Sequence, residues 1–197
     1  MKRYGIMGGT FDPIHIGHLF VAEEIRCHFH LDKIIFVPNG NPPHKESVTD
    51  KHLRFEMVEI AIADNPNFEI SDIEMHGDSH IYTIDTIKRL KEKDPQNEYH
   101  FIFGSDSLYD LPKWKSYSEL MELCNFIAIG RPGFKTSDID IPEEYRGKVE
   151  ILNTLEIPVD STNIRSRVLE GKNIKYLVSS GVEKYIYDKK IYMGAGI

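Results

Sequence analysis

The sequence is poor in cysteine, long apolar runs and excess positive charge. Only two of its 197 residues are cysteines. Cys27 and Cys124 lie far apart, which excludes a disulfide-stabilised fold and gives no paired spacing for structural zinc. No apolar stretch approaches the ~18 residues that a membrane span needs, and the first residues lack the apolar core of a signal peptide. We therefore expect a cytoplasmic protein without a membrane partner.

Negative charge prevails over positive charge. Lys and Arg number 24 against 31 Asp and Glu, which gives a formal net charge of −7. This balance argues against a broad basic face for nucleic acid, so we expect no nucleic-acid partner. Any positive charge that holds a polyanion must be local.

Short apolar runs alternate with helical apolar patterns along the chain. This alternation is typical of an α/β fold with a mostly parallel sheet, and the length fits one domain, residues 1–197. We expect a Rossmann-like, doubly wound sheet with a small C-terminal helical region at about 160–197. The expected strands are 3–7, 33–37, 68–73, 99–103, 126–129 and 149–152, and the expected helices are 16–29, 51–63, 83–93, 117–124, 162–169 and 182–187.

The segment 8–18 carries most of the chemical information. Gly8 and Gly9 follow the first expected strand and allow close approach of a phosphate to backbone N–H groups. His15 and His18 open the following helix three residues apart, so both can face one anion, and Gly17 leaves the space between them clear. Such donors suit stabilisation of charge on a reacting phosphate. The pattern is neither a P-loop nor a dinucleotide-binding glycine motif, and since no third ligand accompanies the two histidines, we expect no resident metal site.

The His15-Ile16-Gly17-His18 segment resembles the His-x-Gly-His signature of the nucleotidyltransferase superfamily. The longer form that begins at Gly8 resembles the bacterial nicotinate-nucleotide adenylyltransferases. Four further segments agree with that family in order, namely 41–45, 82–86, 103–106 and 161–165. The resemblance implies that ATP and nicotinate mononucleotide react with Mg²⁺ to give deamido-NAD and pyrophosphate, and it leaves room for a homo-oligomer.

The resemblance also implies roles for individual residues. The residues expected to act on the reacting phosphates are His15, His18 and Arg165. Those expected to bind ATP are Gly8, Gly9, Thr10, Phe11, Lys45, Gly104, Asp106, Ser161 and Thr162. Those expected to bind the mononucleotide are Thr83, Thr86, Trp114 and Arg131.

Several alternatives stay open at this point. An enzyme of the same chemistry can use nicotinamide mononucleotide or phosphopantetheine, and a non-catalytic nucleotide sensor can share the fold. Trp114 can be simple core packing, Arg131 a surface residue and Asp106 a helix cap. Asp160 stands where the family often has serine, and its carboxylate is unfavourable beside a triphosphate unless it faces away or meets magnesium.

Overall fold

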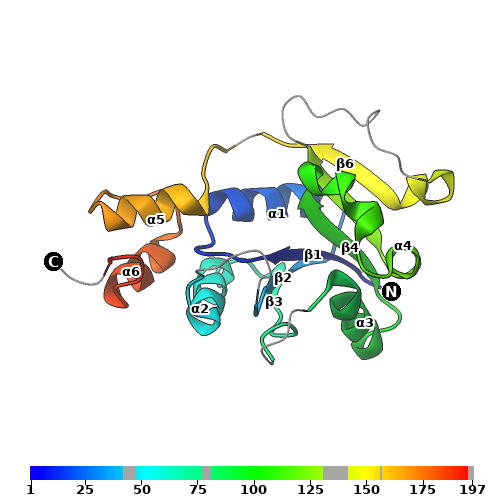
Figure 1. Cartoon of the computed structure of the whole chain (residues 1–197), viewed down its shortest axis with the longest axis horizontal. Coiled ribbons are helices and arrows are strands. Elements are labelled where there is room, and N and C mark those ends of the chain that lie inside the picture. Colours follow the sequence, from blue (N-terminus) through cyan, green and yellow to red (C-terminus); the bar gives the residue numbers. More distant parts are fainter. Residues whose placement is uncertain (42–47, 77–80, 131–141, 156, 195–197) are drawn as a thin grey trace.

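A six-stranded parallel sheet forms the centre of the molecule (Figure 1). The computed structural model describes residues 1–41, 48–76, 81–130, 142–155 and 157–194. The strand order is β3-β2-β1-β4-β5-β6, and each neighbouring pair is parallel. The strands are β1 (Arg3–Gly9), β2 (Lys33–Pro38), β3 (Phe68–Ile70), β4 (Glu98–Gly104), β5 (Asn125–Gly130) and β6 (Val149–Asn153). The predicted doubly wound, Rossmann-like sheet is confirmed.

Helices cover both faces of the sheet and bury two hydrophobic cores. One core receives α1 (Ile16–His28), α2 (Lys51–Ile62), α5 (Ser161–Leu169) and α6 (Ser180–Asp188). The other receives α3 (Thr83–Lys93) and α4 (Tyr117–Leu123). Successive side chains of a strand point to opposite faces: on β2, Ile34 and Phe36 enter the first core, while Ile35 and Val37 enter the second. In Figure 1, α5 and α6 lie together at the end of the molecule away from β6 and α4.

The observed elements differ from the expected ones at their ends and in the segments that connect them. The strand expected at 68–73 ends at Ile70, because the Ser71 N–H still reaches the Phe36 carbonyl but the chain then turns, with the Met75 N–H donating to the Asp72 carbonyl. Within the described residues, the structure contains three short 3₁₀ helices that the sequence did not predict: η1 (Ser105–Tyr109), η2 (Leu111–Lys113) and η4 (Glu143–Lys148). Asp50 caps α2, since its carboxylate accepts from the N–H groups of His52 and Leu53.

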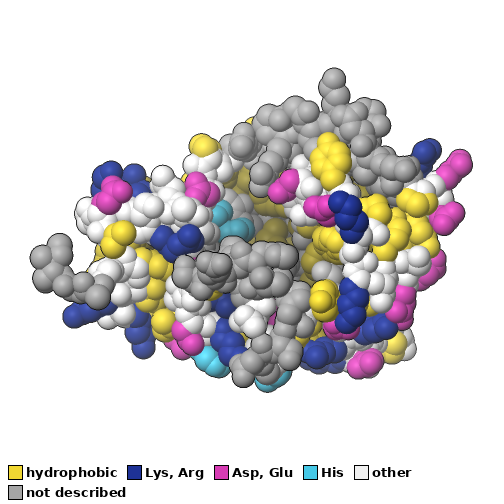
Figure 2. Space-filling view, in the orientation of Figure 1, with side chains coloured by type: hydrophobic (Ala, Val, Ile, Leu, Met, Phe, Trp, Pro, Cys, Tyr) yellow, Lys and Arg dark blue, Asp and Glu magenta, His cyan; other side chains and the backbone are white. Residues whose placement is uncertain are grey.

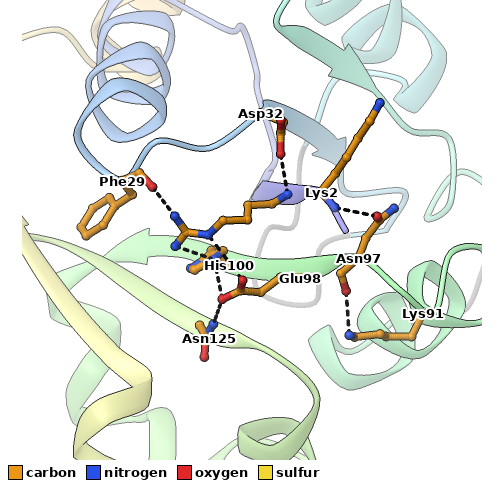
Figure 3. Close-up of polar contacts among 9 residues, drawn as sticks. Lys2, Phe29, Asp32, Lys91, Asn97, Glu98, His100 and Asn125 are labelled. Atoms are coloured by element: carbon orange, nitrogen blue, oxygen red, sulfur yellow. Dashed lines mark hydrogen bonds and ion pairs between the residues drawn. The ribbon is translucent and has the colours of Figure 1, made fainter.

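The two ends of the sheet differ in character. At the amino ends of β1, β4 and β5, Arg3 donates to the Phe29 carbonyl at 2.7 Å and lies 3.4 Å from Glu98, whose other oxygen accepts from Asn125 (Figure 3). His100 is buried in this cluster. At the carboxyl ends the chain reverses its direction of winding between β1 and β4, where ligands of such sheets bind. No helix in the described ranges has the length and apolar character needed to span a bilayer.

Candidate active site

Two cavities of about 450 Å³ each open at the carboxyl end of the sheet, on either side of β1. Met7 lines one cavity and Gly8 lines the other, since consecutive strand residues face opposite sides. We name the first the histidine cavity; it is lined by Met7, His15, Gly17, His18, Val21, Ile129, Gly130, Thr154, Leu155, Ile157, Pro158, Val159 and Asp160. Figure 2 shows histidine side chains beside hydrophobic ones in a hollow near the middle of one face.

His15 and His18 lie against each other in the histidine cavity. Their ring centroids are 3.7 Å apart with 26° between the planes. The His15 backbone N–H donates to His18 Nδ1 at 3.2 Å. A neutral His18 therefore carries its proton on Nε2 and can donate from there. The Phe11 ring packs on His18 in a T-shaped arrangement, with 5.1 Å between centroids.

His15 is buried, with 8% of its surface exposed, and its Nδ1 has no hydrogen-bond partner among the described residues. Burial lowers the pKa of His15 from 6.5 to about 4, although the Asp160 carboxylate acts in the opposite direction. At neutral pH the imidazole is uncharged, and a polar atom remains available for a ligand. An incoming anion would raise this pKa, because opposite charge favours the protonated ring.

The amino termini of α1 and α5 both point at the histidine cavity, through Gly17 and His18 of α1 and the cap residue of α5. The Asp160 carboxylate caps α5 by accepting from the Asn163 N–H at 2.8 Å. The first amide of α1, on Ile16, donates to the Leu177 carbonyl. The dipoles of the two helices favour an anion here.

A tightly held turn joins β1 to α1. A side chain at Gly9 would come within 2.9 Å of the Phe11 ring, so this glycine is needed for packing. Phe11 has a φ of +48°, in the left-handed region that bulky residues avoid. The buried Arg54 guanidinium donates to the Thr10 carbonyl at 2.7 Å. On the α5 side, Ser161 Oγ donates to the Pro13 carbonyl at 2.9 Å.

The second cavity has the Trp114 indole in its wall, and we name it the tryptophan cavity; it is lined by Gly8, Val37, Asn39, Glu74, Ile81, Tyr82, Thr83, Ile84, Thr86, Phe101, Lys113, Trp114, Lys115 and Leu120. Trp114 is half-buried and packs on Phe101 and Phe103, with 5.8 and 5.6 Å between centroids. Its role in packing and its place in the cavity wall therefore coexist. An aromatic surface of this kind suits a flat heterocycle.

Buried polar groups lie in the wall of the tryptophan cavity. The Glu74 carboxylate accepts from Thr86 Oγ1 at 2.6 Å and from Asn39 Nδ2 at 3.0 Å. Only 1% of Thr86 and 9% of Glu74 are exposed. Lys115 supplies positive charge to this wall, with Nζ 3.2 Å from Asp85 Oδ2 and 4.4 Å from the centre of the Tyr82 ring. This set of donors, acceptors and an aromatic face fits a polar heterocyclic ligand.

The structure brings some expected site residues to the cavities and leaves others outside. His15, His18, Gly8, Thr83, Thr86 and Trp114 line a cavity. Within the described part of the chain, the two linings do not include Gly9, Thr10, Phe11, Gly104, Asp106, Ser161, Thr162 or Arg165. The Asp106 carboxylate lies over Gly104, where an added Cβ would be 2.4 Å from Oδ1. Arg165 donates to the Asp12 carbonyl at 2.8 Å. The expected ligands Lys45 and Arg131 lie outside the described residues.

Sequence reasoning missed several residues around the site. Glu74 and Asn39 gave no periodic signal, although Asn39 follows a buried strand at the edge where ligands bind. Arg54 did give a periodic signal. It lies on the buried face of α2 with Met57, Val58 and Ala61, where the helical period predicts an apolar residue. A charged residue in such a stripe indicates a buried polar network.

Metal ligands are sparse here. In the ranges that the structure describes, no group of three or more His, Cys, Asp or Glu side chains is placed to hold a metal ion. Asp160 is the acidic residue of the histidine cavity lining. One carboxylate is compatible with Mg²⁺ that is bound mainly by substrate phosphates and water.

Known proteins are similar to this chain over nearly their whole length. A family model described as cytidylyltransferase-like matches residues 6–167. The chain is 46% identical to a probable nicotinate-nucleotide adenylyltransferase of Thermoanaerobacter sp. (strain X514), over 96% of this chain and 94% of that protein. It is 43% identical to one of Desulfitobacterium hafniense (strain Y51), over 97% and 96%. A solved Plasmodium falciparum nicotinic acid mononucleotide adenylyltransferase complexed with NaAD has a TM-score of 0.78 and 26% identity, covering 98% of both chains.

Proposed function

This chain belongs to the cytidylyltransferase-like family, and from that membership we propose that it is a nicotinate-nucleotide adenylyltransferase of NAD biosynthesis. It joins ATP and nicotinate mononucleotide to give deamido-NAD and pyrophosphate. The observation that carries the assignment is the pair of cavities flanking the end of β1, one with stacked imidazoles and one with an indole. They provide separate sites for two substrates whose phosphates must meet.

ATP occupies the histidine cavity in this proposal. The apolar side chains of Val21, Ile129 and Ile157 suit the adenine ring, and the start of α1 faces the triphosphate. The neutral His15 and the Nε2–H of His18 contact the phosphates as the charge on them grows. Thr10, Phe11, Ser161 and Arg165 support this geometry through the β1–α1 turn.

Nicotinate mononucleotide occupies the tryptophan cavity. The pyridine ring stacks on Trp114, Thr83 contributes at the start of α3, and Lys113 and Lys115 supply positive charge for the ring carboxylate. An oxygen of the mononucleotide phosphate attacks the α-phosphorus of ATP. The new P–O bond forms as the bond from the α-phosphorus to the oxygen that bridges to the β-phosphorus breaks, and pyrophosphate leaves with that oxygen. Because the attacking phosphate is already ionised, no general base is required, and catalysis consists of positioning and charge stabilisation.

Mg²⁺ accompanies ATP in this proposal. Asp160 is the side chain that would help to hold it, with triphosphate oxygens as the main ligands. The bound ion would neutralise negative charge on the phosphates. Asp160 has a second role that needs no metal, since it caps α5.

The reaction is placed in the cytoplasm, without nucleic-acid or membrane partners. Cys27 and Cys124 are both free thiols, which agrees with a reducing compartment. A homo-oligomer remains part of the proposal.

Parallel assays test the substrate assignment. The wild-type chain with ATP and Mg²⁺ is given nicotinate mononucleotide, nicotinamide mononucleotide or phosphopantetheine, and both pyrophosphate and the adenylylated product are measured. We expect deamido-NAD formation to exceed the other two reactions by at least a hundredfold in kcat/KM, because a site that pairs a carboxylate leaves its donors unpaired with the amide. Equal rates with the acid and the amide would refute the specificity, and ATP binding without pyrophosphate release would identify a sensor.

A further inference from the structure

The C-terminal segment reaches back to the turn that precedes the paired histidines. The Tyr192 hydroxyl donates to Asp12 Oδ1 at 2.6 Å, across 180 positions of the sequence. Asp12 is buried, and Tyr192 is half-buried. Burial, and next the adjacent Asp12 charge, raise the pKa of Tyr192, so the hydroxyl keeps its proton and remains a donor. Tyr192 holds this contact from a backbone with φ +66°, a conformation that bulky side chains avoid.

Three segments that are distant in sequence form hydrogen bonds with Asp12 in the β1–α1 turn. Its Oδ2 accepts from the Thr49 N–H at 3.2 Å, just before α2. Its backbone carbonyl accepts from Arg165 of α5 at 2.8 Å. Tyr192 supplies the third contact, on Oδ1. His15 follows Asp12 by three residues and is the N-cap of α1, so a shift of the turn moves the imidazole that faces the phosphates.

We propose that Tyr192 is a positioning residue: its hydroxyl fixes the Asp12 carboxylate, and through it the placement of His15 and His18 in the histidine cavity. The inference rests on the proposed function. Small displacements of groups that act on a transition state have large effects on rate. Loss of the hydroxyl should therefore lower kcat and leave the KM for the mononucleotide, which binds in the other cavity, nearly unchanged.

The chain offers a matched control for this contact. Tyr185 of α6 also donates to a carboxylate, Glu56 Oε2, at 2.5 Å, but among the described residues neither member of this pair forms a hydrogen bond with the β1–α1 turn. Tyr192→Phe and Tyr185→Phe each remove one hydroxyl from a tyrosine–carboxylate pair. We expect Y192F to lower kcat about tenfold with KM within twofold, and Y185F to keep the wild-type kcat.

A double-mutant cycle shows whether Tyr192 acts through Asp12. Asp12→Asn should lower kcat at least threefold, and adding Y192F to D12N should have a much smaller effect than Y192F alone, because coupled residues are not additive. Full additivity would overturn the proposal. If Y192F proves too unstable to assay, D12N carries the test, and a wild-type kcat in D12N would overturn it.

A readout independent of turnover completes the experiment. We expect Y192F, and not Y185F, to shift the imidazole ¹H–¹³C resonances of His15 and His18 in the free protein. Unmoved resonances, or a kcat for Y192F within twofold of wild type, would refute the positioning role. A wild type that forms no dinucleotide would instead refute the proposed function, and the resonances would still decide the role of Tyr192. If Y192F and Y185F lost kcat and melting temperature to the same extent, Tyr192 would serve only the stability of the fold. That result would also overturn the proposal.

Discussion

The His15 ring stacks on the His18 ring at a centroid distance of 3.7 Å, while the backbone N–H of His15 donates to His18 Nδ1. His15 thus orients His18 both through its ring and through its main chain. The backbone bond fixes which nitrogen of His18 carries the proton, and burial keeps His15 uncharged. Two imidazoles that are already held in place before a substrate binds are suited to stabilising charge as it develops.

Replacement of His18 by alanine should lower kcat by about 10²–10³, the usual cost of removing one transition-state donor. Steady-state pyrophosphate release at saturating ATP and nicotinate mononucleotide measures this. His28→Ala is the matched control, because His28 lies exposed at the other end of the same helix. A loss below threefold in H18A would remove His18 from the mechanism.

His15 should titrate far below the exposed histidines. Its pKa of about 4 means that the ring stays neutral from pH 8 to pH 5, whereas a solvated imidazole changes over near 6.5. Binding of a non-hydrolysable ATP analogue should raise the pKa, since the triphosphate favours the protonated ring. Histidine NMR titrations with and without the analogue measure both values. A free-protein pKa near 6.5 would contradict the burial argument.

The parts predictable from the sequence are those with local causes. The strands follow from short apolar runs and the helices from an apolar period of 3.6 residues, and the histidine pair follows from its spacing at a strand-to-helix turn. Glu74 and Tyr192 could not be found in this way, because their partners are distant in sequence. Glu74 contacts Thr86, 12 positions away, and Tyr192 contacts Asp12, 180 positions away. Tertiary structure alone brings such partners together.

The structure gives Arg165 contacts that the sequence did not predict. The sequence indicated a phosphate-binding guanidinium at the start of a helix, and the structure places it beside the β1–α1 turn. There it donates to the Asp12 carbonyl and to Thr162 Oγ1. Its phosphate-binding role stays a prediction, and its backbone acceptor could not be found from the sequence, because Asp12 lies 153 positions away.

Low pH should reduce the free energy of unfolding, because buried histidines bind protons less readily than exposed ones. Burial lowers the pKa of His100 below 6.5, despite the nearby Glu98. The unfolded chain therefore binds more protons than the folded one below pH 6.5. The stabilisation is complete above that pH and is lost as the pH falls toward the folded pKa.

Urea unfolding at pH 7.5 and pH 5.5 measures this loss. We expect His100→Gln to reduce the fall in unfolding free energy between the two pH values, because the variant has no buried imidazole that must take up a proton. The exposed His28→Gln serves as the control and should leave the pH dependence unchanged. An identical pH dependence in H100Q and wild type would show that His100 is not held neutral.

Trp114→Ala should raise the KM for nicotinate mononucleotide about tenfold, while the KM for ATP changes less than threefold. The loss of stacking on the heterocycle accounts for this magnitude. Trp114→Phe retains an aromatic face and should recover most of the affinity. Initial rates with each substrate varied in turn give both constants. A larger effect on ATP than on the mononucleotide would place the indole in the other subsite.

Gly17→Ala should lower the activity without lowering the stability of the fold. A Cβ at this position would lie 3.1 Å from His15 Nδ1 and 3.2 Å from Cε1, so the ring would have to move. Alanine is the better helix former, and the unfolding free energy should stay level or rise by about 0.5–1 kcal/mol. The displaced imidazole should lower kcat by about 10–100-fold.

Gly147→Ala is the control for this variant, since an added Cβ there has no neighbour within 4 Å in the described structure. It should leave kcat unchanged. Urea unfolding and initial rates on the two variants provide the comparison. If G17A lost stability and activity together, the glycine would serve the fold of α1. If its kcat stayed within twofold of wild type, the position of the His15 ring would not limit the reaction. A rise in stability with a fall in kcat is expected only where the small residue is kept for the histidine.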